Sequence, residues 1–318
     1  MSGTHHAAAI PPQPDFTATF PGPHPASPHS RRTERELLSW LEEYPLLPHA
    51  KPRSILVNIT SHGASRTFPT AAPDDLALFA KLLLWLTAFD DEHGEANAAA
   101  NPAALVNHSG ELMFVLTGVT PSSTANPFPG ALHDLLARFR ARTSPAKYLG
   151  LAASLRDTIT ALVWEAHHAA EPDGVALATY LAMRPHTVFV RTIIAAAEIV
   201  LDYELADSQR GLASVRCLES SVANLAGWIN DLASYQREAS RGPVQPLSLP
   251  TLLQARYHWE LEQVFTHISG MCEDEADTAR QRITELACAA PSALSAHARA
   301  LENIARSFIW HTSHARYH

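Results

Sequence analysis

Two short stretches of the chain gather polar oxygens at helical spacing, the arrangement that a small divalent cation needs. The first, residues 90–95 (DDEHGE), holds four carboxylates and follows a strongly apolar run. At about 100° per residue, Asp91 and Glu95 lie about 40° apart on one side of a helix, with Asp90 beside them. Hard oxygen ligands at this spacing suit Mg²⁺, which completes its shell with water and phosphate. A solvated acidic helix end is the alternative, although carboxylates there oppose the helix macrodipole.

The second stretch, residues 230–238 (NDLASYQRE), places three oxygen-bearing side chains along one line of a helix. Asn230, Ser234 and Glu238 stand at i, i+4 and i+8, within an arc of about 80° and a rise of about 12 Å. An amide, a hydroxyl and a carboxylate together make a cation site of low net charge. A polar stripe on the surface of an amphipathic helix is the alternative.

Together the two stretches resemble the metal-binding motifs of the microbial class I terpene cyclases. The first resembles the family's aspartate-rich motif in its DDxxxE form, because Gly94 stands at the usual third acidic position. The second resembles the Asn-Asp-x-x-Ser-x-x-x-Glu motif, including a basic residue, Arg237, before the glutamate. The resemblance implies a Mg²⁺-dependent ionisation of an allylic prenyl diphosphate, with three Mg²⁺ ions. The metal ligands it implies are Asp90, Asp91, Glu95, Asn230, Ser234 and Glu238.

A further arginine agrees with the resemblance. Arg184 precedes the second motif at about the distance at which the family keeps its diphosphate-sensing arginine, and Pro185 follows it and disturbs the helix. The family has a helix break here, and its sensor, linker and effector would correspond to Arg184, Thr187 and the carbonyl of Val188. A surface arginine is the alternative.

The end of the chain and three aromatic residues complete the expected site. Arg316 and Tyr317 resemble the family's terminal Arg-Tyr pair, which binds diphosphate on closure, and Arg237 would add a third positive charge. The carbocation needs an apolar, water-free pocket with aromatic faces. Trp85, Phe89 and Trp310 are the residues that we expect to line it.

Helical patterns dominate the chain and predict an all-α, single-domain bundle. Residues 1–32, rich in Pro and His, are expected to form a disordered extension, and residues 33–318 the class I terpene synthase domain. The segment Arg53–Ile59 is the only one with β-branched character. The expected helices cover residues 33–44, 73–93, 129–141, 148–170, 174–202, 208–240, 247–275, 277–289 and 292–312.

Composition excludes several other classes of protein. The formal net charge of -8 offers no basic surface for nucleic acid or an anionic membrane. The apolar runs are too short to span a bilayer, and no basic and apolar leader stands at the N-terminus. The three cysteines form no CxxC pair and are expected to be reduced. These features predict a cytoplasmic protein without membrane insertion, and a homodimer is compatible with them.

Two other functions share part of this pattern. A prenyl-chain-elongating synthase would normally carry two aspartate-rich motifs and a lysine-rich second site, whereas lysine is scarce here. A non-catalytic prenyl-diphosphate-binding or scaffold protein is the other alternative. Gly94 favours it, because a metal site without the usual third acidic residue could bind the diphosphate and not turn it over. For the cyclase, the family default is farnesyl diphosphate (C15), with geranylgeranyl or copalyl-type diphosphate (C20) as alternatives.

Overall fold

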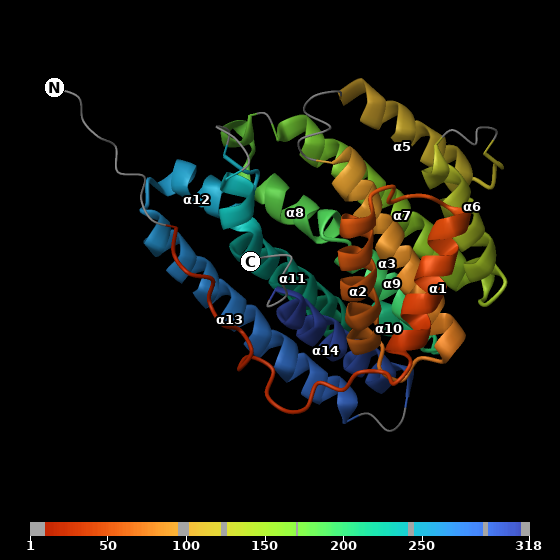
Figure 1. Cartoon of the computed structure of the whole chain (residues 1–318). Helices are drawn as coiled ribbons and strands as arrows, with labels where there is room; N and C mark the ends of the chain where they lie inside the picture. The colour runs from red at the N-terminus through yellow and green to blue at the C-terminus, as the bar shows by residue number, and fades with distance from the viewer. Residues whose placement is uncertain are drawn as a thin grey trace.

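The computed structural model describes residues 10–94, 102–121, 126–169, 171–240, 245–288 and 292–312, and within these ranges all regular structure is helical (Figure 1). The prediction of an all-α fold is confirmed. In chain order the α-helices are α1 (Ser30–Glu43), α2 (Ala50–Thr67), α3 (Pro73–His93), α5 (Pro102–Leu116), α6 (Pro127–Arg140), α7 (Pro145–His168), α8 (Leu177–Thr187), α9 (Val190–Val200), α10 (Asp207–Arg210), α11 (Ala213–Ala239), α12 (Leu249–Tyr257), α13 (Leu261–Ala287) and α14 (Ala293–Thr312). A 3₁₀ turn, Pro172–Gly174, precedes α8.

Local sequence explains where several helices begin. Prolines open α3, α6 and α7, where the missing backbone N–H costs no hydrogen bond. Asn126 and Ser144 cap α6 and α7 by accepting from the backbone N–H groups of Phe128 and Lys147. These helix starts are therefore set by the local sequence.

The buried apolar side chains form one cluster that runs from Phe16 to Ile309. Helix α11 packs along α13 and α14, while α3 packs against α1, α2 and α6. Helices α8 and α9 pack against α7, and each also contacts α11. The helices that carry the two motifs, α3 and α11, are thus separate walls of one bundle (Figure 1).

Three helix assignments differ from the expectation. The β-branched segment Arg53–Ile59 lies within α2, where Leu56, Val57 and Ile59 are buried and Ile55 is exposed. Helix α5 was not expected at all. One helix was expected over residues 247–275 and another over residues 277–289. The observed break lies instead at His258, whose φ of 55° ends α12, and α13 continues through residue 276.

The N-terminal segment also differs from the expectation. Phe16 and Phe20 are 4% and 5% exposed, and Arg306 on α14 donates hydrogen bonds to the carbonyl oxygens of Pro21 and Pro23. The expectation of disorder is therefore wrong for residues 10–32, while residues 1–9 lie outside the described residues. The average composition of the segment hides two phenylalanines that anchor it to the helices.

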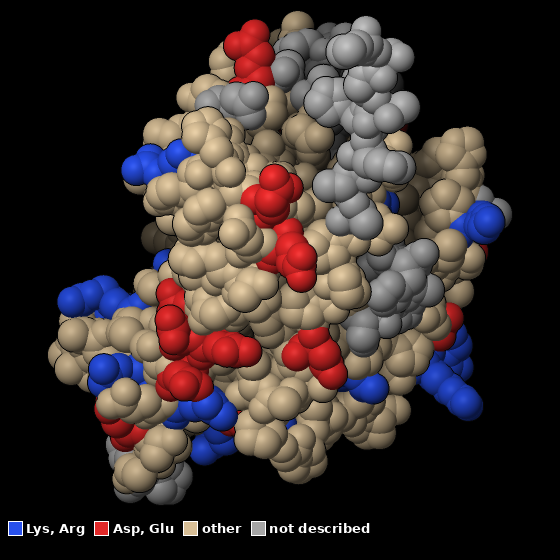
Figure 2. Space-filling view, turned by 90° about the vertical axis from the view of Figure 1, so that its left-hand side faces the viewer, with Lys and Arg blue, Asp and Glu red and all other residues tan. Residues whose placement is uncertain are grey.

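The surface agrees with the acidic net charge. Figure 2 shows Asp and Glu side chains in several clusters on the face that carries α12 and α13 in Figure 1. Helix α13 carries several carboxylates along its length, among them Glu273, Asp274 and Asp277. Among the described residues, no helix is long and apolar enough to cross a membrane.

Candidate active site

The aspartate-rich motif lies at the C-terminal end of α3. Asp90 is partly buried, and Asp91 and Glu92 are exposed. Gly94 follows as the C-cap, where an added Cβ would lie 2.6 Å from the carbonyl oxygen of Asp90 and 2.7 Å from its Oδ1. The departure from the family's third acidic position thus has a local reason, because a side chain at residue 94 would collide with Asp90. Glu95 lies outside the described residues.

The second motif lies on α11, in the turns that precede its C-terminus. Asn230 and Glu238 are partly buried, whereas Ser234 is only 1% exposed. The Oγ of Ser234 has no hydrogen-bond partner among the described residues, and a buried hydroxyl without a partner is unusual in a folded protein. A bound cation would satisfy it. The amide, hydroxyl and carboxylate oxygens present therefore fit a hard divalent metal ion.

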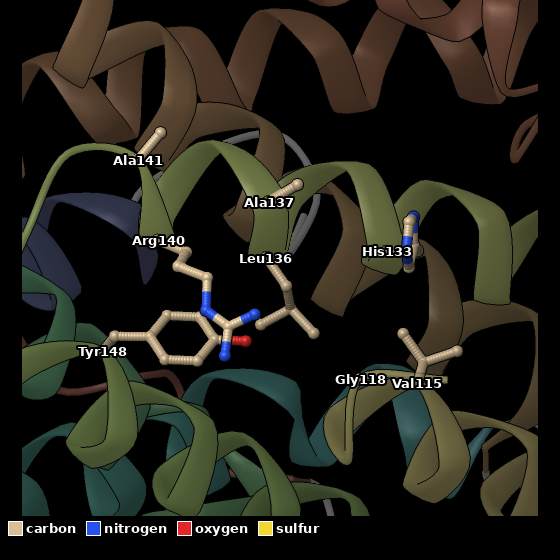
Figure 3. A pocket seen from close by; sticks show the side chains of 8 residues that line it. All are labelled: Val115, Gly118, His133, Leu136, Ala137, Arg140, Ala141 and Tyr148. Atoms are coloured by element: carbon tan, nitrogen blue, oxygen red, sulfur yellow. The ribbon is translucent and has the colours of Figure 1, made fainter. Parts of the chain in front are cut away.

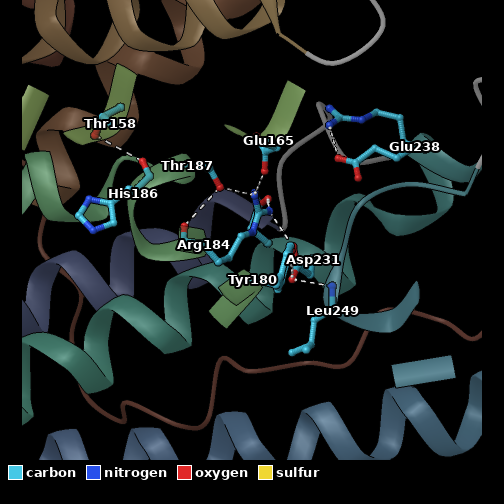
Figure 4. Close-up of polar contacts among 11 residues, drawn as sticks. Thr158, Glu165, Tyr180, Arg184, His186, Thr187, Asp231, Glu238 and Leu249 are labelled. Atoms are coloured by element: carbon cyan, nitrogen blue, oxygen red, sulfur yellow. Dashed lines mark hydrogen bonds and ion pairs between the residues drawn. The ribbon is translucent and has the colours of Figure 1, made fainter. Parts of the chain in front are cut away.

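Arg184 joins the second motif to α7 and α8 (Figure 4). Its side chain is buried, and its Nη2 donates to Asn230 Oδ1 at 2.8 Å and pairs with Asp231 Oδ1 at 2.7 Å. Its Nη1 donates to Thr187 Oγ1 at 3.0 Å and to Glu165 Oε1 at 3.2 Å. The alternative of a surface arginine is excluded, since the guanidinium lies inside the bundle beside an expected metal ligand.

Asp231 anchors this arrangement. It is fully buried, and its Oδ2 accepts from Tyr180 Oη at 2.7 Å and from the backbone N–H of Leu249 at 3.1 Å. Tyr180 and Arg184 are one turn apart on α8, so both reach the same carboxylate. Asp231 thereby connects α8, α11 and the first residue of α12.

The charges in this cluster are strongly coupled. Burial acts to lower the pKa of Arg184, but the negative charge of Asp231, helped by Tyr180 and Glu165, raises it further above its usual range. Burial also raises the pKa of Asp231, against the opposing effect of Arg184. The pKa of Tyr180 is well above its ordinary value because its ring is buried, so the hydroxyl stays a donor.

The helix break predicted after Arg184 is present. Helix α8 ends at Thr187 and α9 begins at Val190, with Pro185 in the last turn of α8. Phe189 has a φ of 65°, a left-handed conformation that costs a residue with a side chain about 1–3 kcal/mol. Thr158 on α7 donates to the carbonyl of His186 at 3.4 Å and helps to hold the break.

Four residues that contact Arg184 or its anchor carried no functional assignment from the sequence. Glu165, Tyr180 and Asp231 are described above. Gly227 lies one turn before Asp231, and an added Cβ there would lie 2.9 Å from Arg184 Cγ. The readable signals were the i, i+4 spacing of Tyr180 and Arg184 and the place of Asp231 inside the second motif, whereas nothing in the sequence connects Glu165 or Gly227 to Arg184.

The expected aromatic residues fall into two groups. Trp85 and Phe89 are fully buried and stacked, with ring centroids 5.4 Å apart, and Trp85 Nε1 donates to the carbonyl of Phe128 on α6. Trp310 on α14 packs beside Gly63, and the guanidinium of Arg66 lies over its ring at 4.7 Å. Arg66 therefore covers one face of Trp310.

The structure describes two of the four remaining site residues, Arg237 and Val188. Arg237 pairs through Nη2 with Glu238 Oε1 at 3.4 Å, so the basic residue and the expected ligand lie together. Arg316 and Tyr317 lie outside the described residues. The main chain of Val188 caps α8 by donating to the carbonyl of Arg184.

A separate pocket of about 280 Å³ lies between α5, α6 and α7 (Figure 3). Arg140 covers the ring of Tyr148 at 5.0 Å on one side of it. None of the expected site residues lines this pocket, so it is distinct from the candidate active site.

A helical bundle with two oxygen-rich motifs and a buried arginine beside one of them defines a class of metal-dependent enzymes that act on diphosphates. Residues 81–278, which include both motifs, match the family model described as terpene synthase family 2, C-terminal metal binding. The chain belongs to this family and is a class I terpene synthase, a lyase with a metal-binding domain that acts on a prenyl diphosphate.

Individual relatives agree. A (12E)-labda-8(17),12,14-triene synthase of Streptomyces cyslabdanicus is 73% identical over 317 residues, which cover 100% of this chain and 96% of that protein. A synthase with the same product name, from Streptomyces anulatus, is 48% identical over 307 residues, which cover 96% of this chain and 95% of that protein. The crystal structure of germacradien-4-ol synthase from Streptomyces citricolor has a TM-score of 0.79 at 18% identity, over 92% of this chain and 97% of that one. This likeness shows the shared fold.

Proposed function

We propose that this chain ionises a bicyclic C20 diphosphate of the copalyl type and releases a labdatriene and pyrophosphate. The observation that carries the proposal is the 73% identity, over the whole chain, with a labdatriene synthase. Farnesyl diphosphate, the usual substrate of the wider family, has less support as the substrate of this chain.

The name of that relative's product fits this reaction. A labda-8(17),12,14-triene keeps the two fused rings and the exocyclic 8(17) double bond of a copalyl-type diphosphate. Breaking the allylic C–O bond sends its electron pair to the diphosphate and leaves an allylic cation. Loss of a proton from the neighbouring carbon then forms the second double bond of the side-chain diene, so no further ring closure is needed.

The side chains of the site divide the work. Asp90, Asp91 and Glu95 on one wall, and Asn230, Ser234 and Glu238 on the other, would hold three Mg²⁺ ions. When bound, these ions offset the charge that grows on the leaving group. Arg184, Arg237, Arg316 and Tyr317 would bind the same diphosphate, where preorganised donors lower the barrier most. Trp85, Phe89 and Trp310 would line the pocket for the carbocation. Thr187 and the carbonyl of Val188 would act as the linker and effector that follow Arg184.

Ionisation also needs a dry pocket, because water would quench the cation. Trp85 and Phe89 precede Asp90 on α3 within two turns of helix, and this position supports their place near its wall. A cytoplasmic location and a homodimeric assembly stay predictions of the sequence.

The test is turnover of the full chain with Mg²⁺ and, separately, farnesyl, geranylgeranyl and copalyl diphosphate, followed by gas chromatography with mass detection. We expect copalyl diphosphate to give a labdatriene with kcat/KM at least about tenfold above the others. Faster turnover of farnesyl diphosphate would contradict the substrate. If no substrate releases pyrophosphate, the non-catalytic binding protein is the better description.

A further inference from the structure

Both amino groups of the Arg184 guanidinium already lie against acceptors of the protein. Nη1 is taken by Glu165 and Thr187, and Nη2 by Asn230 and Asp231. An arginine has five N–H groups, and the fifth, on Nε, is buried and has no partner among the described residues. A diphosphate oxygen that approaches an amino group of Arg184 therefore meets an acceptor that is already there.

The two carboxylates on Arg184 differ in how firmly they are held. The side chain of Asp231 is 1% exposed and keeps two further donors, Tyr180 Oη and the N–H of Leu249. Separating Asp231 from Arg184 would leave a buried carboxylate without its cation, which is strongly unfavourable. Asp231 is therefore the permanent acceptor.

Glu165 is more exposed than Asp231 and lies farther from the guanidinium. It comes from α7, its side chain is 16% exposed, and its contact with Arg184 Nη1 is the longest of the four, at 3.2 Å. Water can solvate its carboxylate once Arg184 is withdrawn, so separation is far less costly than for Asp231. Thr187 lies three residues from Arg184 on the same helix, and both Thr187 and Asn230 are neutral, so neither competes by charge.

The local charge strengthens this contrast. One guanidinium faces two carboxylates, so Arg184, Asp231 and Glu165 together carry a net negative charge. A diphosphate must therefore compete with two carboxylates for one guanidinium.

We propose that Glu165 is a positioning residue that competes with the diphosphate for Arg184, whereas Asp231 holds Arg184 in every state. The inference rests on the proposed role of Arg184 in binding diphosphate. In the empty site Glu165 occupies Nη1 of Arg184, and it yields this amino group to the incoming diphosphate.

The experiment is calorimetric titration of inorganic pyrophosphate, at fixed millimolar Mg²⁺, into the full-length chain. Glu165→Gln keeps the shape of the side chain and removes its charge. We expect it to tighten the Kd of pyrophosphate about fivefold, the scale of a partly exposed ion pair. Asp157→Asn is the matched control, since it removes one exposed carboxylate from the same helix and should leave the Kd unchanged.

Arg184→Gln separates this inference from the function on which it depends. It should weaken pyrophosphate binding at least about tenfold, and in its background Glu165→Gln should no longer tighten binding. Weaker binding in Glu165→Gln alone, or a Kd equal to that of Asp157→Asn, overturns the competition. Wild-type binding in Arg184→Gln overturns the role of Arg184 itself. Glu165→Ala serves as a second variant and should also bind more tightly than the wild type.

Discussion

At the scale of single residues, the position of Arg184 depends on a residue with no side chain. The arginine lies across α11 at Gly227, where a Cβ would be 2.9 Å from Arg184 Cγ. A glycine inside a helix costs about 1 kcal/mol relative to alanine. This cost is offset by the close approach, which lets the guanidinium reach Asn230 and Asp231 together.

Gly227→Ala tests this dependence. We expect turnover to fall about tenfold, because the arginine must move to make room for the methyl group. The helical circular dichroism signal should be kept, since alanine favours the helix. Gly270→Ala on α13 is the control, because nothing lies within 4 Å of its added Cβ, and it should keep full turnover. Wild-type turnover in Gly227→Ala would show that Arg184 need not lie across α11.

The carboxylates at the end of α3 should differ in importance. Asp91→Ala and Asn230→Ala should each lower kcat about 100-fold, because each removes a ligand for charge that peaks in the transition state. Glu92→Ala should be milder, since its side chain points about 100° away from Asp91. Steady-state kinetics at saturating Mg²⁺ would measure all three. Equal losses in Asp91→Ala and Glu92→Ala would mean that the ligands are wrongly assigned.

At the scale of elements, the chain before α1 is part of the fold. Phe16 and Phe20 are buried, and the backbone between them and α1 bonds to Arg306 on α14 and to Ser65 on α2. The segment therefore joins two helices that are far apart in sequence.

Phe16→Ala or Phe20→Ala should lower the free energy of unfolding by about 3 kcal/mol, the usual cost of emptying a buried phenylalanine site. Deletion of residues 1–9 is the comparison and should leave the melting temperature unchanged. Both are measured by thermal and chemical denaturation. A deletion of residues 1–32 that melts like the full chain would show that the buried phenylalanines contribute nothing.

At the scale of the whole molecule, the end of the chain should close a site built from distant helices. Arginine forms a bidentate fork for phosphate oxygens, and tyrosine can donate beside it. Arg316 and Tyr317 should therefore matter once substrate and metal are bound rather than for folding.

Truncation after Ala315 should keep the helical circular dichroism signal, lose most turnover, and weaken the protection against heat that pyrophosphate with Mg²⁺ gives. Addition of a chelator should remove that protection in both the full and the truncated chain. Normal turnover after truncation would exclude Arg316 and Tyr317 from the site. Unfolding would make the tail a structural element instead.

The sequence by itself determined the fold class, the family and the residues at which metal and diphosphate are expected. Helical periodicity, two motifs at fixed spacing and a proline after Arg184 are local signals, because each depends on neighbours within a few turns of helix. The break after Arg184 could be expected for the same reason, although Phe189 as its strained residue could not.

The tertiary structure alone decided which side chains share Arg184. Glu165, Asp231 and the N–H of Leu249 come from α7, α11 and α12, and no periodicity relates residues on different helices. Helix packing also explains why Gly227 has no side chain, since a Cβ there would collide with Arg184. Burial of Phe16 and Phe20 against the helices likewise orders a segment whose composition predicts disorder. Contacts between elements depend on how the helices cross, and the pattern within one helix does not say which residue of another helix it will meet.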